Sequence, residues 1–228
     1  AESSLFASVG DDRRLCIWDV RAAEKGGDQP AAVALNAHNG DITAVAWAPE
    51  ESVLGDCVVA TGGADGAVKL WDFRNLGGGP TKTLANLHAA EATVATLTWA
   101  PWHDSLLMSC ADDGSVFVCD VQRNEASHPK RVEGDAAAIE GDDDDEEYTP
   151  EVMFKHQGHQ GPVTDVAFSP VMPWLAASVD DTNCLHLWVP SDDICHPDEE
   201  DNDADDDNKE SDSGDGNGQS SAKRLRAD

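Results

Sequence analysis

Three stretches of the chain carry a histidine, a hydroxyl residue and an aspartate in the same order. The sets are His38, Thr61 and Asp65; His88, Ser109 and Asp113; and His159, Ser178 and either Asp180 or Asp181. A serine activated by a histidine that an aspartate orients is the constellation of nucleophilic hydrolases. The set recurs along the chain, however, whereas a hydrolase needs a single active site. The recurrence favours buried polar networks that fix local shape, and we expect no catalytic residues.

Other chemical motifs do not stand out from the sequence. The six cysteines show no Cys-x-x-Cys spacing, and no His or Cys cluster has the spacing of a metal site. The glycine-rich stretches 62–68 and 77–80 are interpreted as turns, because no helical pattern follows them. We therefore expect no metal and no cofactor. The cysteines lie mostly in apolar runs and are expected to be reduced, as in an intracellular compartment.

The charge of the chain is extreme and concentrated in two segments. The formal net charge is −30, and residues 133–151 hold ten acids with no Lys or Arg, while residues 192–215 hold thirteen acids and one lysine. Blocks of like charge stay extended and often serve as interaction segments. They repel nucleic-acid phosphates and favour basic partners. No apolar run has the roughly 18 residues of a membrane span. We expect a soluble protein without nucleic-acid or membrane partners.

Four segments of the sequence resemble one another, the first of them incomplete. They are 5–21, 37–74, 87–122 and 158–190. Each complete copy has a histidine, an alternating apolar run that ends in Trp-x-Pro or Phe-x-Pro, and a second run that ends in Ser or Thr. An Asp-rich turn and a third run that closes on Trp-Asp or a variant follow. Alternation with period two, broken by turn residues, predicts three successive antiparallel strands in each copy and an all-β fold.

A repeat of roughly 40 to 50 residues with a His…Trp-Asp signature resembles the WD-repeat β-propellers, in which each repeat supplies a four-stranded blade. The resemblance implies a buried structural tetrad of His38, Thr61, Asp65 and Trp71. In the third copy Cys119 replaces the tryptophan, and the fourth copy retains it as Trp188.

The first copy begins in the middle of a blade, and seven blades of about 42 residues would need roughly 300 residues. We therefore expect the last three blades and part of a fourth from a seven-bladed ring. The expected divisions are a partial blade and loop (1–36), two blades (37–86 and 87–132), an acidic insertion loop (133–151), the last blade (152–194) and a tail (195–228). The tail is expected to be disordered because it has almost no apolar residues. Its basic end at 223–226 is a candidate nuclear import signal.

Four stretches narrow the resemblance: 4–21, 60–76, 150–179 and 185–194. They are similar to the retinoblastoma-binding, MSI-type histone-binding WD-repeat proteins, which are subunits of chromatin assembly, Polycomb and histone deacetylase complexes. This resemblance implies a non-enzymatic nuclear scaffold that binds histones H3 and H4. A sister family, the glutamate-rich WD-repeat proteins of ribosome assembly, shares the Trp-Asp-x-Arg and His-Gln-Gly pieces and is an alternative.

The family also implies a binding groove beside the last blade. There, an acidic loop and an N-terminal helix hold the first helix of histone H4. The positions that match are Asp143, Asp144, Asp145, Glu146, Glu147, Phe154 and Ile194. Carboxylates would pair with Arg and Lys of the histone, and the two apolar side chains would form the floor. Lys155 stands where the family has an apolar residue. The alternative interpretation is a linker loop followed by a strand that starts near Phe154.

Two further sets of residues follow from resemblance. A top-face site for the basic tail of histone H3 would use Asp41, Thr43, Glu91, Thr93, Asp181 and Asn183. The aspartates among them could equally belong to turns or to a tetrad. The two Trp-Asp-x-Arg motifs resemble the short sequence motif by which some propellers bind cullin–RING ubiquitin ligases as substrate receptors. These motif residues are Trp18, Asp19 and Arg21, and Trp71, Asp72 and Arg74. Their alternative interpretation is a solvent-facing arginine after a strand.

Overall fold

The structure is a computed structural model that describes residues 4–23, 28–49, 57–123, 149–191 and 194. Several predictions from the sequence fall outside these residues: the acidic run at 143–147, the tail at 195–228 and its basic end at 223–226. No helix within the described part of the chain is long and apolar enough to span a membrane.

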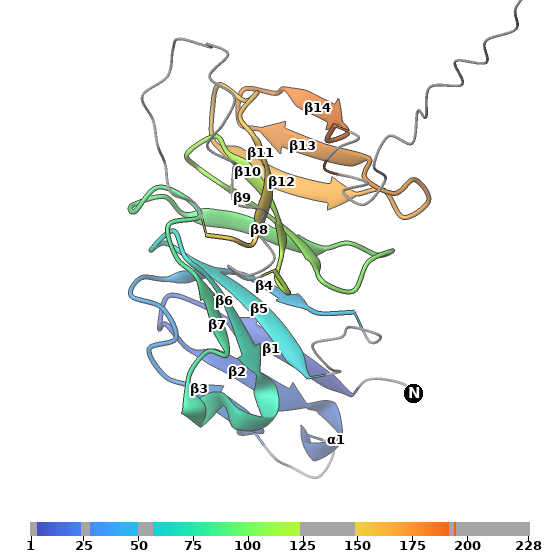
Figure 1. Ribbon diagram of the computed structural model, residues 1–228. Coiled ribbons are helices and arrows are strands. Elements are labelled where there is room, and N and C mark those ends of the chain that lie inside the picture. Colours follow the sequence, from blue (N-terminus) through green and yellow to red (C-terminus); the bar gives the residue numbers. More distant parts are fainter. Residues whose placement is uncertain (1–3, 24–27, 50–56, 124–148, 192–193, 195–228) are drawn as a thin grey trace, which may run out of the picture.

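Four antiparallel sheets follow one another along the chain and are drawn from blue to orange in Figure 1. The first contains β1 (Leu5–Val9), β2 (Leu15–Asp19) and β3 (Ala32–Ala34). The second contains β4 (Ile42–Trp47), β5 (Val58–Gly63), β6 (Val68–Asp72) and β7 (Lys82–Leu84). The third contains β8 (Val94–Trp99), β9 (Leu106–Ala111), β10 (Val116–Asp120) and β11 (Val152–His156). The last contains β12 (Val163–Phe168), β13 (Ala176–Asp180) and β14 (Leu185–Trp188).

Within each sheet the strands are ordered as in the chain, so that neighbours in sequence are neighbours in space. Such an arrangement is that of successive blades, and the predicted all-β, partial propeller is confirmed. One boundary differs from the expected divisions. β11 pairs with β10, with Phe154 opposite Val118, and so completes the third sheet. The sequence analysis had placed this segment at the start of the last blade, because a repeat unit carries the outer strand of the preceding sheet.

The sheets pack face to face and bury apolar side chains between them. Leu15, Ile17 and Trp71 are buried in the cluster that joins the first and second sheets. Leu97 and Phe117 belong to the next cluster, and a third lies between the third and last sheets. All six residues of β5 and of β9 are buried, because both faces of these central strands are covered. Each buried Leu or Phe stabilises the fold by about 1.5–3 kcal/mol, so these interfaces hold the sheets in series.

A β-bulge recurs near the start of the first strand in three sheets. The register shifts between Ile42 and Ala44, between Val94 and Thr96, and between Val163 and Asp165. Bulges redirect side chains and are frequent beside binding sites. At this end of the three sheets the strand pairing is therefore irregular, whereas the rest of each first strand pairs in regular register.

The dipeptide Pro173-Trp174 of the last repeat has a packing role in the turn from β12 to β13. Trp174 adopts a left-handed conformation with φ 65°, which is uncommon for a bulky residue. Its ring lies 5.0 Å from that of Trp102 of the neighbouring sheet, and Trp102 also packs edge-on against Phe168. The motif thus closes the apolar layer between the third and last sheets.

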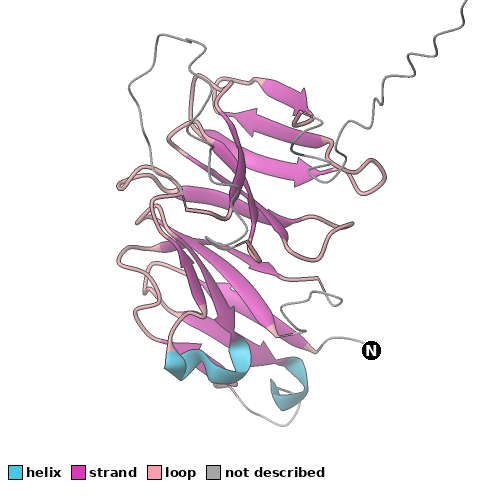
Figure 2. Ribbon diagram, viewed as in Figure 1, coloured by secondary structure: helices cyan, strands magenta, loops and turns pink. Residues whose placement is uncertain are grey.

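Two short helical segments lie at one end of the first two sheets (Figure 2). They are α1 (Val20–Ala23), which follows β2, and the 3-10 segment η1 (Phe73–Gly78), which follows β6. Each begins directly after a Trp-Asp pair, and the Asp72 side chain caps η1 by accepting a hydrogen bond from the Arg74 backbone N–H.

Candidate functional site

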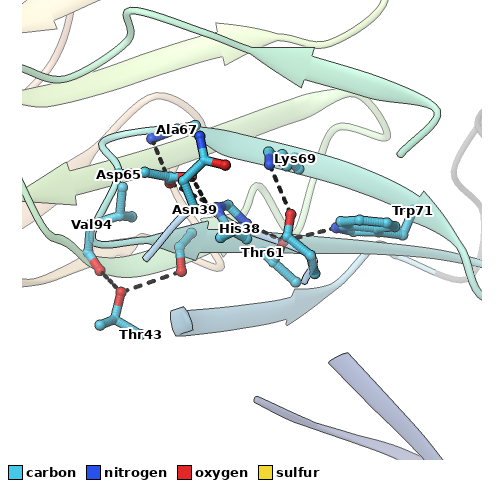
Figure 3. A network of polar contacts seen from close by, with 11 residues as sticks. His38, Asn39, Thr43, Thr61, Asp65, Ala67, Lys69, Trp71 and Val94 are labelled. Carbon is cyan, nitrogen blue, oxygen red and sulfur yellow. Dashed lines mark hydrogen bonds and ion pairs between the residues drawn. The ribbon is translucent and has the colours of Figure 1, made fainter. Parts of the chain in front are cut away.

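The second sheet brings His38, Thr61, Asp65 and Trp71 together in one buried network (Figure 3). His38 Nδ1 lies 2.8 Å from Asp65 Oδ1, and His38 Nε2 lies 2.8 Å from Thr61 Oγ1. Trp71 Nε1 donates to the same Thr61 oxygen at 2.8 Å. With His38 neutral and its proton on Nδ1, the indole donates to the hydroxyl, the hydroxyl to Nε2, and Nδ1 to the carboxylate. Every donor then has an acceptor.

The surroundings of this network fit a structural role and do not fit the hydrolysis of a substrate. Thr61 is 0% exposed, and its oxygen already accepts from Trp71, so a substrate has no approach to the hydroxyl. Burial lowers the pKa of His38 and so keeps the imidazole neutral, although the Asp65 carboxylate opposes this shift. Burial alone would raise the pKa of Asp65, but hydrogen bonds from the Asn39 backbone and from His38 hold it below its usual value.

The third sheet builds a variant of the network without a tryptophan. His88 Nε2 lies 2.9 Å from Ser109 Oγ, and its Nδ1 lies 3.0 Å from Ser115 Oγ and 3.3 Å from Asp113. Ser115 was not anticipated from the sequence, and it donates to the Asp113 carboxylate at 2.6 Å. Burial would raise the pKa of Asp113, yet the hydrogen bonds from His88 and Ser115 bring it well below its ordinary value.

The last sheet resolves which aspartate joins its network. His159 Nδ1 lies 2.9 Å from Asp180 Oδ2, His159 Nε2 lies 2.6 Å from Ser178 Oγ, and Trp188 Nε1 donates to the same serine at 3.1 Å. The Thr182 hydroxyl first, and His159 after it, hold the pKa of Asp180 well below its usual value. Asp181 is left exposed in the turn.

The first sheet keeps two members of the same network. Trp18 Nε1 donates to Ser8 Oγ at 2.9 Å, at positions equivalent to the Trp71 and Thr61 pair. The sequence analysis did not name Ser8, although its place before an Asp-rich turn matched that of Thr61.

Exposed acids lie at the same end of the sheets, directly beside these networks. Asp112 and Asp181 occupy equivalent places in the β9–β10 and β13–β14 turns, since Asp112 N donates to Thr93 O at 3.2 Å and Asp181 N to Pro162 O at 3.1 Å. In the β5–β6 turn the equivalent place is held by Ala64, whose N–H donates to Asp41 O at 2.9 Å, so Asp41 lies beside this turn as Thr93 and Pro162 lie beside theirs. We call Asp41, Glu91, Asp112 and Asp181 the acidic rim; all four are exposed.

The rim is continuous across sheets because the first strands of the sheets are linked at this end. Thr43 Oγ1 donates to Val94 O at 2.5 Å, as Figure 3 shows, and Thr96 Oγ1 donates to Thr164 O at 3.3 Å. These bonds run from β4 to β8 and from β8 to β12. The acids therefore form one negatively charged edge.

The other predicted top-face residues lie at the same end, and two of them, Thr43 and Thr93, form hydrogen bonds within the fold. Thr43 uses its hydroxyl on Val94 and also on Gly62 O at 3.3 Å. The backbone N–H of Thr93 donates to Asp112 Oδ1 at 2.7 Å. Asn183 is exposed and has φ 65°, a conformation that asparagine tolerates in turns. Asp112 was missed from the sequence, where only its register with Asp181 could have indicated it.

The described part of the predicted H4 groove is a strand interface. Phe154 is half-buried in β11, and its ring lies 5.3 Å from that of Trp188 in the last sheet. Lys155 points to the opposite face, where its Nζ lies 5.4 Å from the centre of the Phe117 ring. Ile194 donates its backbone N–H to Ser191 O at 3.0 Å. The carboxylates expected to complete the groove, at 143–147, lie outside the described residues.

The two Trp-Asp-x-Arg motifs have the same local geometry. Arg21 donates to Asp19 through Nε at 3.0 Å and Nη2 at 2.8 Å, and Arg74 donates to Asp72 at 2.9 and 2.7 Å. The hydrogen bonds from Arg21 hold the pKa of Asp19 down at about 2. Both arginine side chains are largely exposed, at 70% and 65%. Each motif thus presents a fixed Asp–Arg fork to solvent.

Sequence comparison relates this repeated architecture to known proteins. The family described as "WD domain, G-beta repeat" matches residues 29–72 and 150–188, two segments that contain the networks of His38 and His159. These two segments match WD repeats. Among curated proteins the chain is similar to "Histone acetyltransferase type B subunit 2" of Debaryomyces hansenii, with 27% identity over 190 residues. This similarity supports the MSI-type relationship inferred from the sequence. The match covers 82% of the WD-repeat chain and 41% of the relative, less than half of its length.

Proposed function

We propose that this WD-repeat chain is a non-enzymatic, chromatin-associated scaffold in the nucleus that binds histones H3 and H4. The observation that carries the proposal is the acidic rim, where four exposed carboxylates lie at one end of the sheets while neighbouring aspartates are held by the histidines of the networks. The similarity to a protein named as a histone acetyltransferase subunit supports a chromatin setting. Chromatin assembly, Polycomb and histone deacetylase complexes are the assemblies that the family resemblance suggests.

The chemistry of the rim fits a basic, extended peptide. Exposed carboxylates pair with Lys and Arg, and an arginine can be held bidentately. The rim acids approach the ligand from successive sheets, so that a peptide lying across the edge would meet them in turn. The net charge of −30 would accelerate encounter with a basic partner and make it sensitive to salt.

The test is a titration of the full chain with H3–H4 at low and at high salt, followed by fluorescence anisotropy. We expect binding that weakens as salt rises and that weakens further in the Asp112→Asn/Asp181→Asn variant. An exposed ion pair contributes about 0.2–1 kcal/mol, so each substitution lowers affinity by up to about fivefold. Asp104→Asn is the matched control, since Asp104 is an exposed-loop acid at the opposite end, before β9. Binding that is insensitive to salt and to both rim positions would refute the proposal.

A second contact with histone H4 is proposed for the acidic loop before β11. Residues 143–147 would pair with basic side chains of the H4 helix, while Phe154 at the base of the loop would contribute apolar surface. Replacing 143–147 by serine and glycine should weaken binding of an H4 helix peptide and leave binding of an H3 tail peptide unchanged. Equal losses for both peptides would indicate a general charge effect and would contradict a separate H4 site.

A cullin–RING ligase receptor is the second candidate function, and the paired Asp–Arg forks are the observation that favours it. Arg21 lies in α1 and Arg74 in η1, the helical segments that follow β2 and β6 and lie at the same end of the molecule (Figure 2). The test is binding to the ligase adaptor by the Arg21→Ala/Arg74→Ala variant. Arg14→Ala is the control, because Arg14 also forms an exposed pair with an aspartate two residues earlier, at 3.2 Å from Asp12, but follows no tryptophan. Adaptor binding lost only in the double variant would favour this function.

A further inference from the structure

Two histidines from different sheets meet at the junction of the third and last sheets. His156 ends β11, and His186 lies in the middle of β14. His156 Nε2 and His186 Nδ1 are hydrogen-bonded at 3.0 Å, and the two rings are nearly perpendicular, at 87°. Both residues are half-buried.

Neighbouring aromatic rings fix the orientation of this pair. His156 stacks on Trp188 with ring centres 4.9 Å apart and an angle of 9°. His186 stacks on His159 with centres 4.0 Å apart and an angle of 17°. Because each imidazole is held by its face, its edge points toward the other imidazole. The two nitrogens are thus positioned before any ligand binds.

His159 completes a group of three histidines whose ligand atoms lie within 4.8 Å of one another. Its own two nitrogens are already occupied by Asp180 and Ser178, at 2.9 and 2.6 Å. Coordination by His159 would therefore break the network of the last sheet. Its role at the junction is to hold the ring of His186.

The pair is peculiar to the last sheet among the complete repeats. His186 lies opposite Ser178 in the strand register, and the equivalent places opposite Thr61 and Ser109 hold Lys69 and Phe117. A lysine is a cation and a phenylalanine has no donor atom, so neither can form such a pair. The general needs of a WD-repeat blade do not account for this histidine.

We propose that His156 and His186 form a two-histidine binding site for a divalent transition-metal ion, with zinc as the ion of reference. Neutral imidazole suits zinc, copper and nickel, whereas magnesium and calcium prefer oxygen. Zinc–nitrogen bonds of about 2.0–2.1 Å in a tetrahedral site place two ligand nitrogens about 3.3 Å apart. At the observed 3.0 Å the two nitrogens share one proton, so ion binding moves that proton to the other nitrogen of its ring and turns the rings until both lone pairs face the ion.

The backbone beside the pair leaves room for the ion. A side chain at Gly158 would place its first carbon about 3.0 Å from His156 and 3.1 Å from His186. Glycine at this position keeps the space between the rings and solvent open. Water would fill the remaining coordination positions, and the ion would tie β11 to β14.

The first test observes the imidazole nitrogens of the unmodified full chain by NMR during titration with zinc chloride. The acidic segments will also bind zinc, but through oxygen, so the nitrogen signals separate the two events. We expect the His156 Nε2 and His186 Nδ1 signals to shift together, while those of His38 and His103 stay in place. Magnesium chloride should shift neither. Zinc binding that leaves both signals unmoved would overturn the proposal.

The second test measures zinc affinity after substitution. Loss of an outer-shell partner of a metal ligand typically costs 10- to 100-fold in affinity, so loss of one of two ligands should cost at least about tenfold. We expect this loss in His156→Gln and in His186→Gln, but not in His103→Gln, which changes a partly exposed histidine elsewhere. Circular dichroism establishes that each variant is folded. If a variant unfolds, the nitrogen signals of the unmodified chain decide the question.

Discussion

Asp113 and Asp112 are neighbours in one turn, yet their carboxylates have different surroundings. Asp113 contacts His88, the Ser115 hydroxyl and the backbone N–H of Ala89. Asp112 is exposed on the rim, and its contact is with the Thr93 backbone at 2.7 Å. The Asp113 carboxylate is held by several donors of its own sheet, and the Asp112 carboxylate by one backbone N–H.

The last sheet also has one network aspartate next to one rim aspartate, but here the network aspartate comes first in the sequence. There Asp180 enters the network, its side chain only 1% exposed, and the following residue, Asp181, lies on the rim. The second sheet has Asp65 in the network but Ala64 at the rim position, where Asp41 supplies the acid from the preceding segment. An Asp-rich turn in this fold therefore contains two kinds of acid, one that holds the blade and one that is available to a partner.

The largest effect is expected when a network loses its histidine. His38→Ala leaves Asp65 and Thr61 without their partner in a site where the His38 side chain is 0% exposed. An unsatisfied buried polar group costs about 1–3 kcal/mol and His38→Ala leaves two, so we expect the free energy of unfolding to fall by about 2–6 kcal/mol. Urea denaturation measures it, with His103→Ala as the exposed control. A loss below about 1 kcal/mol would show that the network does not hold the blade.

The two neighbouring aspartates should differ in a smaller but measurable way. Asp113→Asn weakens hydrogen bonds from four donors to a charged acceptor, and hydrogen bonds to charged groups contribute about 1.5–3 kcal/mol. We expect a loss of stability of that size. Asp112→Asn retains an acceptor for Thr93 and should change stability by no more than about 0.5 kcal/mol. Equal losses in urea denaturation would remove the distinction between network and rim.

Acid should weaken the networks through the same carboxylates. The pKa of Asp113 is lower in the folded chain than the value of about 3.9 expected in an unfolded chain. Its contribution is therefore fully present above about pH 4 and is lost as the pH falls toward the lower folded-state pKa. We expect the stability difference between the unmodified chain and Asp113→Asn to shrink between pH 5 and pH 3, as measured by urea midpoints. A difference that is constant over this range would contradict the assignment.

The sequence predicts most of this fold because alternation of apolar residues and the recurring turn aspartates are local signals. The network of His38 follows from the repeat pattern alone. The choice between Asp180 and Asp181 does not, because either residue can reach His159 and only the turn geometry selects one. Ser115 and Ser8 also escaped notice, since a serine beside a turn is too common to be informative.

Contacts between distant strands could not be read from the sequence. His156 and His186 are 30 residues apart and meet only because β11 and β14 belong to adjacent sheets. Phe154 has a pattern that fits a groove floor, but its packing on Trp188 depends on how the sheets stack. The acidic rim likewise gathers residues from separate repeats, so that only the register of the turns places Asp112 beside the others.

The central claim is that the rim acids bind a basic partner while the adjacent network acids hold the fold. The most direct measurement is the affinity for H3–H4 of the Asp41→Asn/Glu91→Gln/Asp112→Asn/Asp181→Asn variant, with its unfolding free energy measured in parallel. The account predicts a loss of at least about fourfold in affinity, from four exposed ion pairs of about 0.2–1 kcal/mol each, with stability changed little. Unchanged affinity in a folded variant would contradict it.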